Sequence, residues 1–357
     1  MKNGPGKIAE DFVWKMKSQY CKYFYHKKMK NRLKAINGGY KCDKEYKETV
    51  VPYWKKYGYI PSKDWYCMFS NTNHKVDPRY IPDDLYWGEL LPYFNNMSFQ
   101  RYGEDKCYYD VWFSDVKGPK TVCKNIAGIY YDSEMNIINE EKALDLCMNH
   151  GAEILIKPSM DSYGGQHISF FAPDSIKRTD VKKAFNDIGT NFIVQEKLKQ
   201  NAVLGLMNES SLNTIRIISL IFEGEVHILS SILRVGEPGA KVDNFSAGGF
   251  AVQIMENGQL FEKGINGKSE WVSENHNGVK FSDIVIPSYD RVIGTVKKQH
   301  AKLGHFRLIG WDITVDEAAD PVIIEFNINP GTNQVTCGPT FGDLTDKVLD
   351  EYFAKRK

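Results

Sequence analysis

The sequence predicts a mixed α+β fold divided into two or three subdomains. Helical patterns run through residues 1–35, from Lys44 to Tyr57 and from Pro287 to Lys302. Apolar residues alternate with polar ones in several pairs of short segments joined by turns, which is typical of antiparallel hairpins. The 357 residues exceed the roughly 100 to 200 of one compact domain, and 42% of them are hydrophobic, an ordinary share for a globular protein.

Charge and cysteine content exclude several classes of protein. A net charge of +1 argues against wholesale nucleic-acid binding. The 7 cysteines form no CxxC pair, which argues against a disulfide framework and a zinc cage. No apolar run approaches the roughly 18 residues that span a bilayer, and no signal peptide is recognisable. We therefore expect a cytoplasmic protein without a transmembrane segment, and its oligomeric state stays open.

The first 35 residues combine basic and aromatic side chains. They contain ten Lys or Arg against two acids. They are interleaved with aromatic residues that include Trp14, Tyr20, Tyr23, Phe24 and Tyr25. Such a helix could lie on an anionic membrane surface or hold a polyanionic substrate. It could equally be a solvated helix that packs its aromatic rings on the domain behind it.

A loop rich in serine and glycine separates two β-type runs, Glu153 to Pro158 and His167 to Phe171, with Lys157 near the end of the first. Glycine backbone can approach phosphates closely, and a lysine at a strand end adds positive charge. The loop is not a Walker A motif, because GK[ST] is missing and a strand follows. Taken alone, the pattern favours an ordinary hairpin, with a lid over phosphates as the alternative.

The buried run Phe192 to Val194 leads directly into Gln195, Glu196, Lys197 and Leu198. A chain that leaves a buried strand at a domain junction exposes backbone donors and acceptors that can bind a planar base. A plain strand end is the alternative interpretation.

Two arginines are expected on one face of the hairpin formed by Thr214 to Phe222 and Val226 to Val235. The register places Arg216 opposite Ile232 and Arg234 opposite Thr214. Neighbouring guanidiniums on a half-buried face need an anion, and phosphate suits their geometry. The alternative is that this face is exposed to solvent, where water would solvate the guanidiniums and no bound anion would be needed.

A second hairpin, Ile309 to Gly331, brings two carboxylates together. With Asp316 to Pro321 as the connection, the expected register sets Val315 opposite Val322 and Asp312 opposite Glu325. Opposed like charges are destabilising unless a cation lies between them. The apolar side is expected to hold Val322, Ile324, Phe326 and Ile328. Two carboxylates beside the Asn327 amide suit Mg²⁺, whereas acids facing water are the alternative.

These segments occur in the order found in ATP-grasp enzymes. The set consists of Asp105-Lys106, IKP ending at Pro158, Gly164-Gly165, Gln195 to Leu198, Arg234, Asn244 with Gly248-Gly249, Asp312, and Glu325-x-Asn327. Within that superfamily, the phrases NTIRI, VDNFSAGG, IGWDI and IEFNINPG resemble the sugar-transfer associated ATP-grasp family. The resemblance covers roughly residues 75 to 353.

The resemblance implies two α+β subdomains clasping ATP, at 105–195 and 196–357, after a helical or mixed region at 1–104. The implied ATP-binding residues are Lys106, Lys157, Ser162, Gly164, Gly165, Gln195, Glu196, Lys197 and Leu198. Asp312, Glu325 and Asn327 would hold one or two Mg²⁺ ions, with Mn²⁺ as a substitute. Arg234, with Arg216 and Lys157, would act on the transferred phosphoryl group, and Asn244, Gly248 and Gly249 would line the acceptor side. An acid usually follows the hinge sooner than here, which leaves Glu209 as the ribose candidate.

The implied reaction is ATP-dependent ligation. ATP phosphorylates a carboxylate, and an amine then displaces phosphate. The expected partners are a small-molecule carboxylate and an amine or sugar-linked acceptor, in polysaccharide or glycoconjugate synthesis. A phosphotransferase acting on a hydroxyl group and a nucleotide-binding regulator without turnover are the alternatives. The sequence does not specify the substrates.

Overall fold

The computed structural model describes residues 5–160, 167–240, 248–268 and 270–356, with only the backbone of residues 5–11, 14, 15 and 17. The chain forms two compact units. One comprises Met1–Met97, His305–Leu308 and Gly331–Lys357, and the other comprises Ser98–Gly304 and Ile309–Pro330. This division differs from the expected three parts, because the last residues cluster with the N-terminal ones.

The first unit is helical. Its α-helices are α1 (Pro5–Ala35), α2 (Asp43–Glu45), α3 (Val51–Lys55), α4 (Lys63–Phe69), α5 (Asp83–Leu85), α6 (Leu91–Phe94), α13 (Gln334–Cys337) and α14 (Thr345–Lys355). Shorter π and 3₁₀ segments are η1 (Tyr46–Val50), η2 (Tyr86–Leu90) and η7 (Gly342–Leu344). The helical pattern predicted from Lys44 to Tyr57 is therefore confirmed as α2, η1 and α3. Among the described residues, no helix is long and apolar enough to cross a membrane.

Polar contacts tie the two ends of the chain together inside this unit. The Gln334 side chain donates to the Ile81 carbonyl at 2.8 Å and accepts from the Ile81 amide at 2.7 Å. The buried Glu89 carboxylate accepts from the Tyr352 hydroxyl at 2.5 Å and pairs with Lys22 at 2.5 Å and Arg356 at 2.6 Å. A buried carboxylate needs such partners, because desolvation without them is costly.

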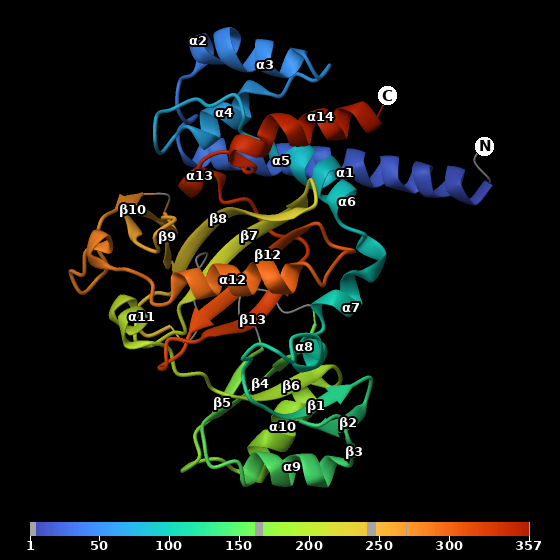
Figure 1. The fold of residues 1–357 in the computed structure, drawn as a ribbon, viewed down its shortest axis with the longest axis vertical. Coiled ribbons are helices and arrows are strands. Elements are labelled where there is room, and N and C mark those ends of the chain that lie inside the picture. Colours follow the sequence, from blue (N-terminus) through green and yellow to red (C-terminus); the bar gives the residue numbers. More distant parts are fainter. Residues whose placement is uncertain (1–4, 161–166, 241–247, 269, 357) are drawn as a thin grey trace. The chain divides into compact units, whose positions relative to one another are not determined.

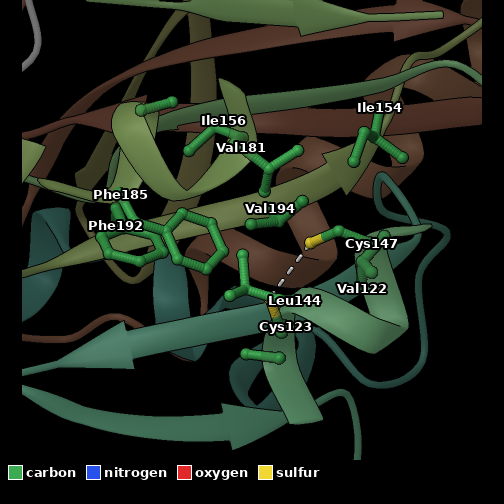
Figure 2. Packing of buried hydrophobic residues seen from close by; sticks show 12 residues of the cluster. Val122, Cys123, Leu144, Cys147, Ile154, Ile156, Val181, Phe185, Phe192 and Val194 are labelled. Carbon is green, nitrogen blue, oxygen red and sulfur yellow. Dashed lines mark hydrogen bonds between the residues drawn. The ribbon is translucent and has the colours of Figure 1, made fainter. Parts of the chain in front are cut away.

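The second unit contains a six-stranded sheet in the order β3-β2-β1-β6-β4-β5. Its strands are β1 (Thr121–Ile126), β2 (Ile129–Asp132), β3 (Ile137–Ile138), β4 (Ile154–Pro158), β5 (Ser169–Phe171) and β6 (Phe192–Glu196). Helices α9 (Glu140–Met148) and α10 (Arg178–Ile188) cover it (Figure 1). Figure 2 shows apolar side chains of these helices packed against those of the strands. The sulfur atoms of Cys123 and Cys147 lie 3.9 Å apart within this core. Short segments precede this sheet: η3 (Met97–Phe99), α7 (Gln100–Glu104), η4 (Lys106–Tyr108) and α8 (Tyr109–Trp112).

A seven-stranded antiparallel sheet completes the unit, in the order β11-β10-β9-β8-β7-β12-β13. Its strands are β7 (Thr214–Phe222), β8 (Glu225–Val235), β9 (Phe250–Ile254), β10 (Leu260–Asn266), β11 (Trp271–Val272), β12 (Leu308–Val315) and β13 (Pro321–Asn327). Helix α12 (Tyr289–His300) packs on β7, β8 and β13, while α11 (Ala202–Met207) and η6 (Phe281–Asp283) lie in the connections (Figure 1). The His300 Nδ1 atom and the Ser219 hydroxyl oxygen form a buried hydrogen bond of 2.7 Å beneath α12. His300 is therefore a helix-end residue that packs on the sheet.

The arginine hairpin has the predicted pairing. Thr214 lies opposite Arg234 and Arg216 opposite Ile232. The turn is one residue shorter than expected, because β8 begins at Glu225, and a register shift after Ile218 restores the pairing. Gly224 and the residue before it both have positive φ, as a two-residue hairpin turn requires.

The carboxylate hairpin keeps Asp312 opposite Glu325, as predicted. The expected pairing of Val315 with Val322 is wrong, because Val315 lies opposite Pro321. A bulge resolves the difference. Since Ile313 pairs with Ile323 while the preceding residue, Asp312, pairs with Glu325, Ile324 is the extra residue.

The bulge also changes the face of Ile324. The expectation that it belongs to the apolar core side is wrong, because it is only half-buried and lines a cavity beside Glu325. Val322, Phe326 and Ile328, expected on that same side, are fully buried.

Candidate active site

The second unit contains a cavity of about 1000 Å³ between residues of its two sheets. That volume suits a nucleotide-sized ligand. Ten of the predicted site residues line it: Lys106, Lys157, Gln195, Glu196, Lys197, Leu198, Glu209, Arg234, Asp312 and Glu325. Arg216 and Asn327 do not line it, but each contacts Asp312, which does. Ser162, Gly164, Gly165 and Asn244 lie outside the described residues.

Two buried lysines converge on Glu325. The Asp105 side chain accepts from the Cys107 amide at 3.0 Å and so caps η4, while the Lys106 amide donates to the Ser159 carbonyl at 3.0 Å. This anchoring directs the Lys106 Nζ to the Glu325 carboxylate, 3.0 Å away. Burial and the neighbouring charge of Lys106 lower the pKa of Lys157 to about 8, against a smaller opposing effect of Glu325. Two cations and one acid leave an excess of positive charge at this end of the cavity.

Arg216 and Arg234 both bind Asp312. The Arg216 guanidinium donates to both carboxylate oxygens, at 2.5 and 2.7 Å, and Arg234 donates to Oδ1 at 3.2 Å. Burial by itself would raise the pKa of Asp312, but the two guanidiniums outweigh it and lower that pKa to about 2. The predicted shared face of the arginines therefore exists, and a carboxylate is the anion that they hold in this structure.

The segment after β6 is anchored on both sides, and one amide is left available. The Glu196 amide donates to the Lys120 carbonyl and the Lys197 amide to the Glu153 carbonyl, each at 2.8 Å. The Glu196 carboxylate lies 2.9 Å from the His150 ring, so it is directed to that histidine. No described residue accepts a hydrogen bond from the Leu198 amide. Leu198 lines the cavity, so its amide is a candidate donor to a planar base.

Apolar residues around this hinge were missed by sequence reasoning. Leu155, Ile168, Phe170 and Leu206 line the same cavity. Leu155 and Phe170 lie in β4 and β5, Ile168 directly precedes β5, and Leu206 lies in α11. Apolar periodicity alone does not show which face of such an element meets a ligand. The half-buried Ile324 was missed because a bulge reverses its face.

Glu209 lines the cavity next to two anchoring residues. The Asn208 side chain donates to the carbonyls of Gly236 and Glu237 at 3.0 Å, and its Oδ1 accepts from the Ser210 amide at 3.0 Å. The loop that carries Glu209 is therefore fixed against the end of β8.

Gly248 and Gly249 are not among the residues lining the cavity. A Cβ on Gly248 would lie 1.7 Å from a Glu237 oxygen, and its φ is +110°. A Cβ on Gly249 would lie 2.1 Å from the Val235 carbonyl oxygen. Gly249 needs glycine because the Val235 backbone passes too close for a side chain, and Gly248 favours glycine because of its positive φ, since the Glu237 side chain can move aside.

The donor atoms around the carboxylate hairpin fit a hard divalent cation. Asp312 and Glu325 supply carboxylate oxygens and Asn327, whose amide lies 3.4 Å from Asp312, supplies an amide oxygen. Among the described residues, no group of three or more His, Cys, Asp or Glu side chains could hold a metal ion. Mg²⁺ commonly takes one or two carboxylates and completes its shell with water and phosphate oxygens, so this set is sufficient.

A sequence profile of the sugar-transfer associated ATP-grasp family matches residues 104–341, which is more than half of the chain. The chain belongs to this family, and its predicted α+β ATP-grasp fold is confirmed. A search of curated proteins found no match.

Several solved ligases are similar in structure. The L-amino acid ligase from Bacillus licheniformis has 12% identity and a TM-score of 0.40, over 72% of this chain and 49% of the ligase. D-cycloserine synthetase DcsG has 13% identity and a TM-score of 0.40, over 72% and 70%. The ATP-grasp ligase PsnB, solved with a precursor variant, Mg and ADP, has 13% identity and a TM-score of 0.41, over 76% and 68%. The chain spans about half the length of the first of these ligases.

Proposed function

We propose that the protein is an ATP- and Mg²⁺-dependent carboxylate–amine ligase that forms an acyl phosphate. The observation that carries the proposal is the convergence of Lys106 and Lys157 on Glu325 inside a nucleotide-sized cavity. An excess of buried positive charge needs an anion, and polyphosphate supplies several charges at once. Membership of the ATP-grasp family supports ATP as that anion.

In this proposal, the nucleotide base lies at the hinge. The Leu198 amide donates to adenine, while Leu155 and Phe170, which pair across β4 and β5, pack on one face of the base. Gln195, Glu196 and Lys197 shape the rest of that wall. The acid at 209, fixed beside β8, accepts from the ribose hydroxyls. Lys106 and Lys157 bind the phosphates, and the segment with Ser162, Gly164 and Gly165 covers them.

The transferred phosphoryl group lies between the lysines and the arginines. Arg234 donates to its oxygens, and Arg216 acts as a positioning residue because it grips Asp312 through two bonds. Glu325 is the principal metal ligand, since both Asp312 oxygens already accept from guanidiniums. When bound, one or two Mg²⁺ ions would neutralise the developing charge on phosphate, and Mn²⁺ would substitute.

The chemistry divides into two balanced steps. A substrate carboxylate oxygen attacks the γ-phosphorus of ATP, so the acyl phosphate forms and ADP leaves. The amine then attacks the acyl carbon, and inorganic phosphate leaves with the bonding electron pair as the amine loses a proton. A sugar-linked acceptor fits the family description, which supports a role in polysaccharide or glycoconjugate synthesis. Asn244, Gly248 and Gly249 belong to the acceptor side in this proposal.

The experiment is trapping of the acyl phosphate with hydroxylamine. The protein is incubated with ATP, Mg²⁺ and a panel of amino acids and sugar acids. We expect an acid-dependent hydroxamate together with equal amounts of ADP and phosphate. A stable phosphorylated product without free phosphate would instead identify a phosphotransferase, and the ligase proposal would be abandoned.

A further inference from the structure

Helix α1 presents a row of large apolar side chains to solvent. We call them the α1 stripe, and their exposed fractions are Phe12 65%, Val13 52%, Met16 55%, Tyr20 68%, Tyr23 68% and Phe24 46%. At about 3.6 residues per turn, these positions fall within roughly a third of the helix circumference. Single exposed apolar residues are common, but a continuous stripe over several turns marks an interaction surface.

The stripe lies on the side of α1 that does not pack on its own unit. The packed side carries the buried Met29 and Leu33. On that side the Tyr25 ring also stacks on Trp87, with centroids 5.5 Å apart. Of the described aromatic side chains of α1, only that of Tyr25 is not exposed, so packing on the domain behind the helix does not account for the others.

Positive charge continues the same face. Lys27, Lys30 and Lys34 follow the stripe at helical spacing, and all three are exposed. Lys28 and Arg32 are also exposed, but they lie nearer the packed side of the helix. Among the side chains described on α1, every exposed charged group is therefore a cation, and residues 1–35 as a whole contain ten Lys or Arg against two acids.

We propose that α1 docks on an anionic lipid bilayer, with the stripe at the acyl boundary and the lysines at the phosphate headgroups. Aromatic and aliphatic side chains on one face with flanking lysines are the composition of interfacial helices. A parallel second copy of α1 fits less well, because pairing through the stripe would set Lys27, Lys30 and Lys34 of both copies side by side. The bilayer is the surface whose charge complements the helix.

The test is flotation of the full chain with vesicles of phosphatidylcholine and phosphatidylglycerol in equal parts, compared with pure phosphatidylcholine. We expect binding to the anionic vesicles that weakens as salt is raised. The stripe variant Phe12→Ser/Tyr20→Ser/Tyr23→Ser should lower the partition coefficient roughly tenfold or more. The charge variant Lys27→Gln/Lys30→Gln/Lys34→Gln should remove the preference for anionic vesicles.

Two matched controls make the result specific to α1. Ile60→Ser/Ile137→Ser/Val285→Ser removes exposed apolar side chains elsewhere and should leave binding unchanged. Lys41→Gln/Lys44→Gln/Lys47→Gln removes three exposed charges outside α1 and should do the same. Circular dichroism verifies that each variant is folded.

Several outcomes would overturn the proposal. They are absence of vesicle binding by the unchanged chain, equal losses in the control variants, and binding to poly-glutamate with none to vesicles. A dimer in light scattering that the stripe variant abolishes, without vesicle binding, would assign the stripe to a second copy instead.

Discussion

Among single residues, Lys157 combines burial with a pKa of about 8, which is low for a lysine. Its ammonium group is therefore lost at mildly alkaline pH, whereas an unperturbed lysine stays charged there. If this ammonium binds the phosphates of ATP, nucleotide binding should titrate with it.

We predict that kcat/KM for ATP falls about tenfold per pH unit above a pKa of about 8. In Lys157→Arg the guanidinium stays charged, so this alkaline limb should disappear even if the overall rate is lower. Initial rates across the pH range measure both proteins. An unchanged limb in Lys157→Arg would assign the titration to another group.

Glu325→Gln should reduce ATP turnover by roughly 10²-fold to 10³-fold, because it removes the principal proposed Mg²⁺ ligand. Glu317→Gln is the matched control, since Glu317 lines the same cavity and lies outside the ion pair with Lys106. ADP release at saturating Mg²⁺ measures turnover. Equal rates in both variants would refute the metal assignment.

Asp312 should make stability depend on acid pH. Its pKa is about 2 in the folded chain and near 3.8 in the unfolded one. The stabilisation is therefore complete above pH 3.8 and is lost as pH falls through 2, at roughly 2 kcal/mol for this group. Urea unfolding of the protein and of Asp312→Asn should show a smaller acid-dependent loss in the variant. Parallel pH profiles would contradict the prediction.

At the scale of elements, both site hairpins reach their register through an extra residue. Pairing of Arg216 with Ile232 and of Asp312 with Glu325 was predictable, because turn position and alternation fix register to within one residue. The bulge was not predictable. Residues 323 and 324 are both isoleucines, and nothing in the local sequence indicates which of them is the unpaired residue of the bulge.

The two isoleucines give a matched pair of substitutions. Ile323→Ala removes a buried side chain and should cost roughly 2 to 4 kcal/mol of the free energy of unfolding. Ile324→Ala should cost less than about 1.5 kcal/mol and raise KM for ATP instead, because this side chain lines the cavity. Denaturant unfolding and steady-state kinetics separate the two effects. A larger stability loss at 324 would place that residue in the core.

For the whole molecule, the two compact units are not consecutive along the chain. The ATP-grasp segments were predictable because each carries its own chemistry in a fixed order. Closure of the helical unit was not, because it depends on pairs such as Ile81 with Gln334 and Glu89 with Arg356. These are single polar contacts between residues far apart in the sequence, and no local pattern marks them.

Removal of residues 345–357 should destabilise the helical unit and leave nucleotide binding intact. The deletion takes α14 away, and Glu89 loses two of its partners, Tyr352 and Arg356, at a cost of roughly 3 kcal/mol. The cavity is lined only by residues of the other unit. Calorimetry and titration with a fluorescent ATP analogue measure the two properties. Loss of both together would show that the units depend on each other.

The discontinuous helical unit also has a consequence for synthesis on the ribosome. Its N-terminal part emerges first, yet it cannot close until Gly331–Lys357 has been translated. At about 5 to 20 residues per second, the intervening residues 98–330 take on the order of 10 to 50 seconds. During that time the Glu89 carboxylate cannot form its hydrogen bond with Tyr352 or its ion pair with Arg356. The nascent chain therefore carries an unfinished helical surface while the whole ATP-binding unit is made, and this interval is when chaperones would act on it.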